Sequence, residues 1–103
     1  MGKKTFLLVV YDISNDRRRG KLHQALLDFG TPVQYSVFEC WLDEEEQAQL
    51  RRVIRRIVRP KKGDAVRFYF LCAACVDKIE VLGGVDVTGP SPPAWVVGDG
   101  EGG

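Results

Sequence analysis

Hydrophobic residues recur along the chain with two periods, one typical of strands and one typical of helices. Strands are predicted by three stretches rich in β-branched and aromatic residues, namely 5–13, 32–42 and 64–71. Between them, residues 16–29 and 44–58 place hydrophobic side chains every three or four positions, which predicts amphipathic helices. A weaker hydrophobic stretch predicts one more short strand at residues 79–82.

The order of these elements predicts an α+β protein with a ferredoxin-like fold. In the second strand region the hydrophobic positions change parity near Val37, which indicates a bulge or a tight hairpin instead of one flat strand. Ser14 or Asn15 can cap the first helix, and Asp43 with Glu46 forms a capping box for the second. We therefore expect βαββαβ order, an antiparallel sheet with two helices on one face, and a short C-terminal strand.

The predicted sheet is hydrophobic on both faces. The first strand alternates two hydrophobic sets, Phe6, Leu8 and Val10 on one face and Leu7, Val9 and Tyr11 on the other. Residues 64–71 are likewise hydrophobic on both parities, apart from Arg67. Because two helices cover only one face, a monomer would expose a large hydrophobic patch. A homodimer that closes sheet against sheet is the simplest arrangement that buries this patch.

Composition limits the class of protein. The 103 residues allow one domain, and 45% hydrophobic with 28% charged residues is typical of a globular one. The longest hydrophobic run, residues 6–10, is too short for a membrane span or a signal peptide, so we expect no membrane association and a cytoplasmic location. Seven of the 11 glycines lie at or beyond residue 83, which predicts a domain over 1–84 and a Gly/Pro-rich tail over 85–103.

Charge is balanced overall but clustered locally. Fifteen basic and 14 acidic residues give a net charge of +1, so the overall charge does not attract nucleic acid. One basic cluster opens the first predicted helix and consists of Arg17, Arg18, Arg19 and Lys21. A second lies on the polar face of the second predicted helix and just beyond its end, and consists of Arg51, Arg52, Arg55, Arg56, Arg59, Lys61 and Lys62. Each cluster either binds phosphate groups or is an ordinary solvated face, and the pattern leaves both interpretations open.

Asp12 is the first candidate for catalysis. It ends the first strand on the parity of Leu8 and Val10, which is the face that would meet a second copy. Two Asp12 carboxylates brought together there would suit a hard cation such as Mg²⁺, which can generate a nucleophilic water. The alternative is a strand-end aspartate that caps the following turn or pairs with an arginine.

The cysteines and the single histidine give weaker signals. Cys72 and Cys75 form a lone CxxC pair, and Cys40 stands apart from them. Without a second pair or nearby histidines we expect buried or half-buried structural thiols, not a zinc or redox site. His23 has no second histidine to form an acid–base pair, so a nuclease built on this chain would depend on a metal ion.

Three segments together resemble the CRISPR-associated protein two family, whose members are small endonucleases and central subunits of the spacer-integration complex. The segments are Leu-Val-Val-Tyr-Asp-Ile at 8–13, Arg-Gly-Lys-Leu at 19–22 and Val-Gln-Tyr-Ser-Val-Phe-Glu-Cys at 33–40. Residues 64–72 and 81–84 resemble later strands of the family, so the similarity runs from Thr5 to about Gly84.

The resemblance implies a homodimer whose final strand crosses to the partner's sheet, with a Mg²⁺ site at Asp12 in the dimer interface. It also implies cleavage of single-stranded RNA or double-stranded DNA and assembly with the CRISPR integrase. By the same resemblance Arg19 and Lys21 contact phosphate, while Tyr11 and Phe38 shape the site. Some members carry an arginine where this chain has Pro32, so one phosphate contact is missing.

Two functions remain open. The first is a Mg²⁺-dependent endonuclease with Tyr11, Asp12, Arg19 and Phe38 at its catalytic site. The second is a non-catalytic dimeric adaptor that binds DNA and bridges integrase dimers. The residues expected to bind nucleic acid in either case are Arg17, Arg18, Arg19, Lys21, Arg52, Arg55, Arg56 and Arg59.

Overall fold

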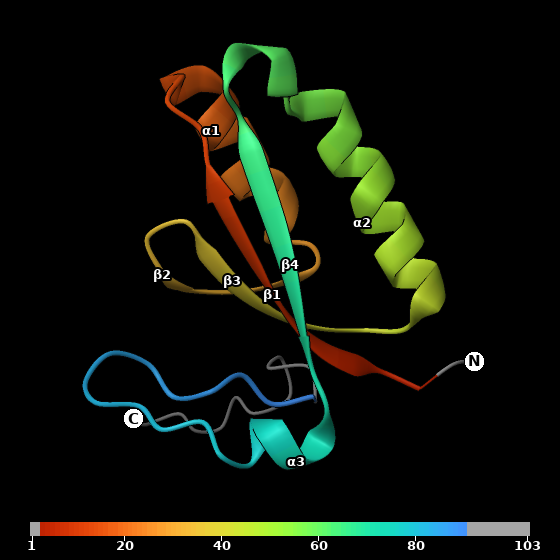
Figure 1. Ribbon diagram of the computed structural model, residues 1–103, viewed down its shortest axis with the longest axis vertical. Helices are drawn as coiled ribbons and strands as arrows, with labels where there is room; N and C mark the ends of the chain where they lie inside the picture. Colours follow the sequence, from red (N-terminus) through yellow and green to blue (C-terminus); the bar gives the residue numbers. More distant parts are fainter. Residues whose placement is uncertain (1–2, 91–103) are drawn as a thin grey trace.

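A single antiparallel sheet forms the centre of the protein in the computed structural model, which describes residues 3–90 (Figure 1). Its strands pair in the order β2-β3-β1-β4, as the ferredoxin-like prediction requires. The elements in chain order are β1 (Thr5–Asp12), α1 (Asp16–Leu26), β2 (Gly30–Gln34), β3 (Val37–Leu42), α2 (Glu44–Ile57), a 3₁₀ turn (Pro60–Lys62), β4 (Ala65–Leu71) and α3 (Ala73–Val76).

Both long helices begin at the caps that the sequence predicts. The Asn15 side chain accepts a hydrogen bond from the Arg18 amide at 2.8 Å, which satisfies one free N–H of α1. Asp43 and Glu46 form a full capping box at the start of α2, with bonds of 2.8 and 2.9 Å. The first helix ends at Leu26, three residues earlier than expected, because the chain tightens into a turn there.

The hydrophobic core lies between the two helices and one face of the sheet. From the helices it takes Leu22, Leu26, Leu50 and Ile54; from the strands it takes Leu7, Val9, Tyr11, Phe38, Cys40 and Leu42. All the β1 members have one parity, so both helices cover the same face. We call the other side the open face. It carries Leu8, Val10 and Asp12 of β1, Glu39 and Trp41 of β3, and Arg67 and Tyr69 of β4.

The region of changing parity contains both a hairpin and a bulge. Strands β2 and β3 are joined at Tyr35 and Ser36, where Ser36 has a positive φ of 64°. Their register shifts between Pro32 and Gln34, which marks the bulge. Both features that the change of parity indicated are therefore present in this stretch.

The chain beyond β4 departs from two expectations. Within the single chain residues 79–82 form no strand, because the chain leaves the sheet edge through α3; Leu82 is 98% exposed, and the crossing to a partner's sheet that the resemblance implies stays a prediction. The expectation of buried thiols at Cys72 and Cys75 is also wrong, because both side chains are exposed around the single turn of α3.

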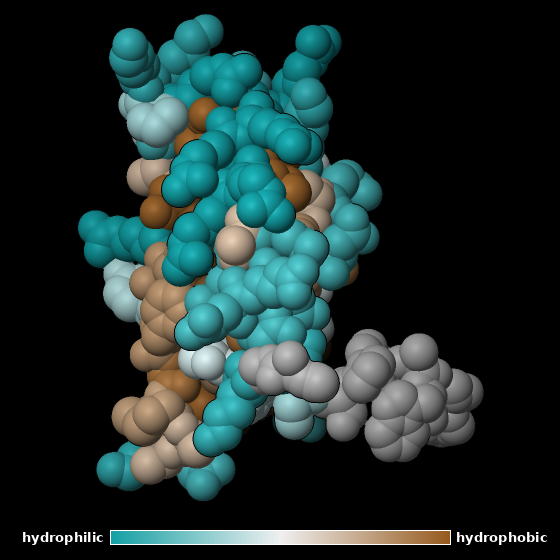
Figure 2. Space-filling model, turned by 90° about the vertical axis from the view of Figure 1, so that its right-hand side faces the viewer, coloured by the Kyte–Doolittle hydropathy of each residue, from teal (hydrophilic) through white to brown (hydrophobic). Residues whose placement is uncertain are grey.

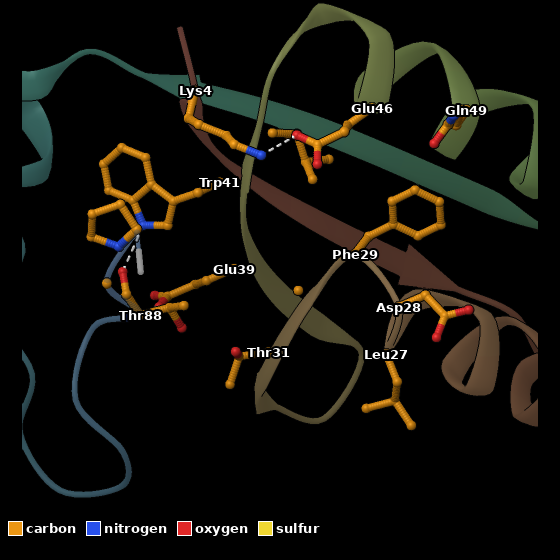
Figure 3. A pocket seen from close by; sticks show the side chains of 14 residues that line it. Lys4, Leu27, Asp28, Phe29, Thr31, Glu39, Trp41, Glu46, Gln49 and Thr88 are labelled. Atoms are coloured by element: carbon orange, nitrogen blue, oxygen red, sulfur yellow. Dashed lines mark hydrogen bonds and ion pairs between the residues drawn. The ribbon is translucent and has the colours of Figure 1, made fainter. Parts of the chain in front are cut away.

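The last described residues return to the sheet and contact β3. The indole N–H of Trp41 donates to the Thr88 carbonyl at 2.8 Å, and the Thr88 amide donates to a carboxylate oxygen of Glu39 at 2.8 Å (Figure 3). These contacts cover the β3 half of the open face and leave Glu39 buried. The predicted boundary between a domain at 1–84 and a tail at 85–103 stays a prediction, and residues 91–103 lie outside the described part.

No helix within residues 3–90 combines the length and the hydrophobicity needed to span a bilayer.

Candidate functional site

Asp12 lies at the end of β1 on the open face and is exposed, with Ala65 of β4 opposite it in the register. The alternation of β1 places it in line with Val10 and Leu8, as the sequence predicts. Two of the three arginines that follow it at 17–19 bind other carboxylates, since Arg18 pairs with Asp64 and Arg19 with Asp16. The Asp12 carboxylate is therefore open to solvent or to a ligand.

Tyr11 lies on the opposite side of the sheet from its neighbour Asp12. Its hydroxyl is 3.4 Å from Nδ1 of His23 on α1, and burial raises the pKa of the phenol. The two rings open onto a cleft of about 300 Å³, lined also by Arg19 and Tyr35. One strand thus supplies a carboxylate to the open face and a phenol to a cleft on the helical side.

Arg19 closes one wall of this cleft. Its guanidinium donates to the carbonyl of Ile13 at 2.9 Å and binds the carboxylate of Asp16. These contacts fix the loop between β1 and α1 and raise the pKa of the guanidinium. The Arg19 side chain is 27% exposed and lines the cleft.

Phe38 is fully buried beneath the cleft. Its ring lies edge-on to the imidazole of His23, with centroids 5.2 Å apart, and 6.4 Å from the ring of Tyr11. A side chain with no exposed surface orients its neighbours and does not itself reach a polymeric substrate. Its position agrees with a shaping role.

Arg18 is held inside the fold. Two hydrogen bonds of 2.7 and 3.0 Å join its guanidinium to the carboxylate of Asp64, whose side chain has no exposed surface. The guanidinium holds the pKa of that carboxyl below its ordinary value. Of the first basic cluster, Arg17 and Lys21 are the side chains that project into solvent.

The second basic cluster covers the outer surface of α2 and the turn after it. Arg52, Arg55, Arg56 and Arg59 are exposed, whereas Arg51 lies over the ring of Phe68 at 5.6 Å. Figure 2, viewed from the side on which α2 lies in Figure 1, shows hydrophilic side chains over most of this surface, with hydrophobic atoms exposed along its left-hand side. The exposed guanidinium groups form a positive strip that suits a phosphate backbone.

The part of the chain that the structure describes contains no group of three or more His, Cys, Asp or Glu side chains arranged to hold a metal ion. A cation at Asp12 would therefore take one carboxylate from each chain and fill its other positions with water or substrate.

Sequence reasoning missed His23 as a site residue. Arg19 and His23 are four residues apart, so one face of α1 presents both to the same cleft. The sequence alone therefore places Arg19 and His23 on one face of the helix. The missing information was that Tyr11 lies opposite this helix face, which only the packing of α1 on the sheet reveals.

The model of the family described as CRISPR-associated protein Cas2 matches residues 5–79. The chain belongs to the Cas2 family. The matched range contains the Asp12 strand, the Tyr11–His23 cleft and the basic surface of α2.

Individual Cas2 proteins match most of the chain. A CRISPR-associated endoribonuclease Cas2 of Chloroflexus aurantiacus is 42% identical over 87 residues, which cover 84% of this chain and 89% of the relative. A CRISPR-associated endonuclease Cas2 of Thermus thermophilus is 44% identical over 92 residues, covering 89% and 91%. Among solved structures, one chain of a partial Cas6-RT-Cas1–Cas2 complex superposes with a TM-score of 0.67 at 27% identity, covering 76% of this chain and 90% of that one.

Proposed function

We propose that this chain is a metal-dependent Cas2 nuclease that hydrolyses phosphodiester bonds and takes part in CRISPR spacer acquisition. The observation that carries the proposal is the exposed Asp12 carboxylate at the end of β1, in a chain whose relatives are named endoribonucleases and endonucleases. The cytoplasmic location expected from the sequence agrees with this role and stays a prediction.

The donor atoms at Asp12 fit Mg²⁺. A carboxylate is a hard oxygen ligand, and Mg²⁺ sites in proteins use one or two carboxylates with several waters. Asp12 alone supplies one, so a second copy of the chain would supply the other. When bound, Mg²⁺ lowers the pKa of water and stabilises the negative charge of a phosphate under attack.

A homodimer closed over the open face would bring two Asp12 residues together. Leu8, Val10 and Tyr69 give that face neighbouring hydrophobic side chains, and Tyr69 is 44% exposed in the single chain. Burial of such side chains contributes about 25 cal/mol per Å² to association. This geometry supports the sheet-to-sheet dimer expected from the sequence.

The remaining site residues act by binding and positioning. Lys21 and Arg17 present free cations near the start of α1, close along the chain to Asp12, and would hold phosphates that flank the scissile bond. Arg19 and Phe38 keep the β1–α1 loop and the cleft in shape. Tyr11 and His23 share a hydrogen-bond contact on the helical side, which anchors the strand end that carries Asp12.

The deciding experiment compares the wild-type protein with Asp12→Asn on single-stranded RNA and double-stranded DNA, with Mg²⁺ and with chelator. The amide keeps the size of the side chain but loses the charge that attracts a cation. Metal-dependent cleavage should fall by at least about a hundredfold in the variant. Asp77→Asn, at another exposed aspartate, is the matched control and should cleave normally. Equal cleavage by both variants would disprove the role of Asp12.

A second candidate function, the non-catalytic adaptor, is favoured by the strip of exposed arginines on α2 and by the similarity to the Cas2 chain of a complex that includes Cas1. Here α2 would hold a DNA duplex while the integrase binds elsewhere on the dimer. Because each phosphate contact steepens the salt dependence of binding by about 0.9, replacing Arg52, Arg55 and Arg56 by alanine should flatten the slope by about 2–3.

The control for this test is the pair Lys3→Ala and Lys78→Ala, which removes exposed cations away from α2. Nuclease activity lost in Asp12→Asn with DNA binding intact supports the enzyme. Spacer acquisition that survives Asp12→Asn but fails in the triple arginine variant supports the adaptor.

A further inference from the structure

The CxxC pair lies where the chain leaves the sheet. Cys72 follows directly on Leu71, the last residue of β4, and Cys75 lies within α3. Both side chains are exposed, whereas Cys40 is buried in the core. Exposed cysteines are accessible to disulfides and other oxidants. Whether they react as a pair depends on how their two sulfur atoms are arranged.

Cys72 and Cys75 lie three residues apart across one turn of helix. Cys72 is the N-cap residue of α3 and Cys75 is three residues further on, and the Val76 amide closes the turn on the Cys72 carbonyl at 3.0 Å. The N-cap residues Asn15 and Asp43 use their side chains to accept the amide three residues on, each at 2.8 Å, whereas the Cys72 side chain makes no such capping bond. Both thiols are therefore free of capping bonds, and the spacing of three residues places them on the same side of the turn, within reach of each other.

The two thiols differ in acidity. The backbone amide and the thiol of Cys75 lower the pKa of Cys72, and Cys72 in turn raises the pKa of Cys75. Burial raises the pKa of Cys40 to about 12, so this core thiol is far less ionised at neutral pH than an ordinary exposed cysteine. Since the thiolate is the nucleophile, Cys72 is the side chain that attacks first, and Cys75 is placed to attack second.

We propose that Cys72 and Cys75 form a redox-active dithiol that exchanges with small-molecule disulfides and closes reversibly into an intramolecular disulfide. The Cys72 thiolate attacks one sulfur of a disulfide such as oxidised glutathione, forming a mixed disulfide and releasing one glutathione thiolate, which takes up the proton that Cys72 has lost. The Cys75 sulfur then attacks the Cys72 sulfur and expels the second glutathione, which takes up the proton of Cys75. Two protein thiols are oxidised and one disulfide is reduced to two thiols.

The site is independent of the proposed nuclease. Cys72 and Cys75 belong to the turn that redirects the chain from β4 toward Thr88, far along the sequence from Asp12. Closing the disulfide ties the two ends of this turn together. The segment from Asp77 to Thr88 would thereby leave the sheet in one fixed direction.

The experiment equilibrates the full-length protein, with chelator present, in buffers of graded reduced-to-oxidised glutathione ratio. Free thiols are then trapped by alkylation and each species is identified by intact mass and peptide mapping. We expect the wild type to lose two titratable thiols together, at Cys72 and Cys75, and to regain them in reducing buffer. Cys40 should stay reduced and label at least about a hundredfold more slowly in the folded protein.

Two single variants test the order of attack. Cys75→Ser should stop at the mixed disulfide on Cys72, and Cys72→Ser should react several-fold more slowly than Cys75→Ser. The proposal is overturned if the wild type accumulates only the mixed disulfide, if it forms disulfides between chains, or if both exposed thiols stay reduced at every ratio.

Discussion

Arg18 and Asp64 join the start of α1 to the start of β4 through two hydrogen bonds, from Nε to Oδ2 at 2.7 Å and from Nη2 to Oδ1 at 3.0 Å. The same carboxylate accepts the backbone amide of Arg59 at 2.8 Å, just beyond α2. One buried aspartate therefore links both helices to the edge strand. An arginine from a run that suggests nucleic-acid binding acts here as a cross-link within the fold.

Removing this carboxylate should destabilise the protein. Asp64→Ala leaves the guanidinium of Arg18 and the amide of Arg59 without their partner, and we expect the melting temperature to fall by roughly 5–10 °C. Thermal unfolding followed by circular dichroism measures the change. Asp77→Ala, at an exposed aspartate, should change it by less than about 2 °C. A double variant that also carries Arg18→Ala should be little worse than Asp64→Ala alone, because the pair is already broken.

The same pair gives the protein an acid-sensitive component of stability. The guanidinium of Arg18 lowers the pKa of Asp64 in the folded state from its ordinary 3.8. The stabilisation is therefore fully present above pH of about 4 and is lost as the pH falls through the folded-state pKa. Melting temperatures of the wild type and of Asp64→Asn, measured from neutral to strongly acid pH, should converge in acid. A difference that stays constant across this range would contradict the prediction.

Two glycines should respond to alanine in opposite directions. A Cβ at Gly30 would lie 2.4 Å from the Cys40 sulfur and 2.5 Å from the Glu39 carbonyl oxygen, so Gly30→Ala should cost roughly 1–3 kcal/mol of unfolding free energy. Gly20 lies within α1 with no atom within 4 Å of such a Cβ, so Gly20→Ala should add about 0.5–1 kcal/mol. Denaturant unfolding measures both, and equal effects would show that the β2–β3 contact is looser than described.

The contacts of Thr88 should be separable from the packing of Trp41. Trp41→Phe removes the indole donor but keeps an aromatic ring beside Phe6, whose ring centroid lies 5.2 Å from that of Trp41. Loss of a hydrogen bond worth about 1 kcal/mol should speed amide exchange at Thr88 roughly fivefold. Hydrogen exchange measures this directly. Tyr69→Phe alters the same open face away from Thr88 and should leave the rate unchanged.

The sequence predicted those parts of the fold that rest on local patterns. The parity of β1 placed Asp12 beside Val10 on one face, and the capping box at Asp43 marked the start of α2. Each follows from neighbouring residues and the geometry of a single element. The turn of φ 64° at Ser36 and the bulge at Pro32 also left a local trace, as a change of parity.

Contacts between residues far apart in the sequence could not be predicted. Arg18 and Asp64 are 46 residues apart, so the sequence showed a basic run where the fold has an ion pair. Tyr11 and His23 meet only because α1 packs across β1. The short strand expected at residues 79–82 is absent from the single chain, because its pairing depends on the backbone of another sheet.

The docking of Thr88 divides the open face into two unequal parts. Above β3 the sheet is already occupied by the chain's own backbone, whereas Leu8, Val10 and Tyr69 along β1 and β4 are not. A second copy that packs on this face would lie over β1 and β4, beside the Thr88 segment. The segment after β4 thus sets the lateral limit of the interface, so shortening the chain before Thr88 would disturb the alignment of two copies while leaving every side chain of β1 in place.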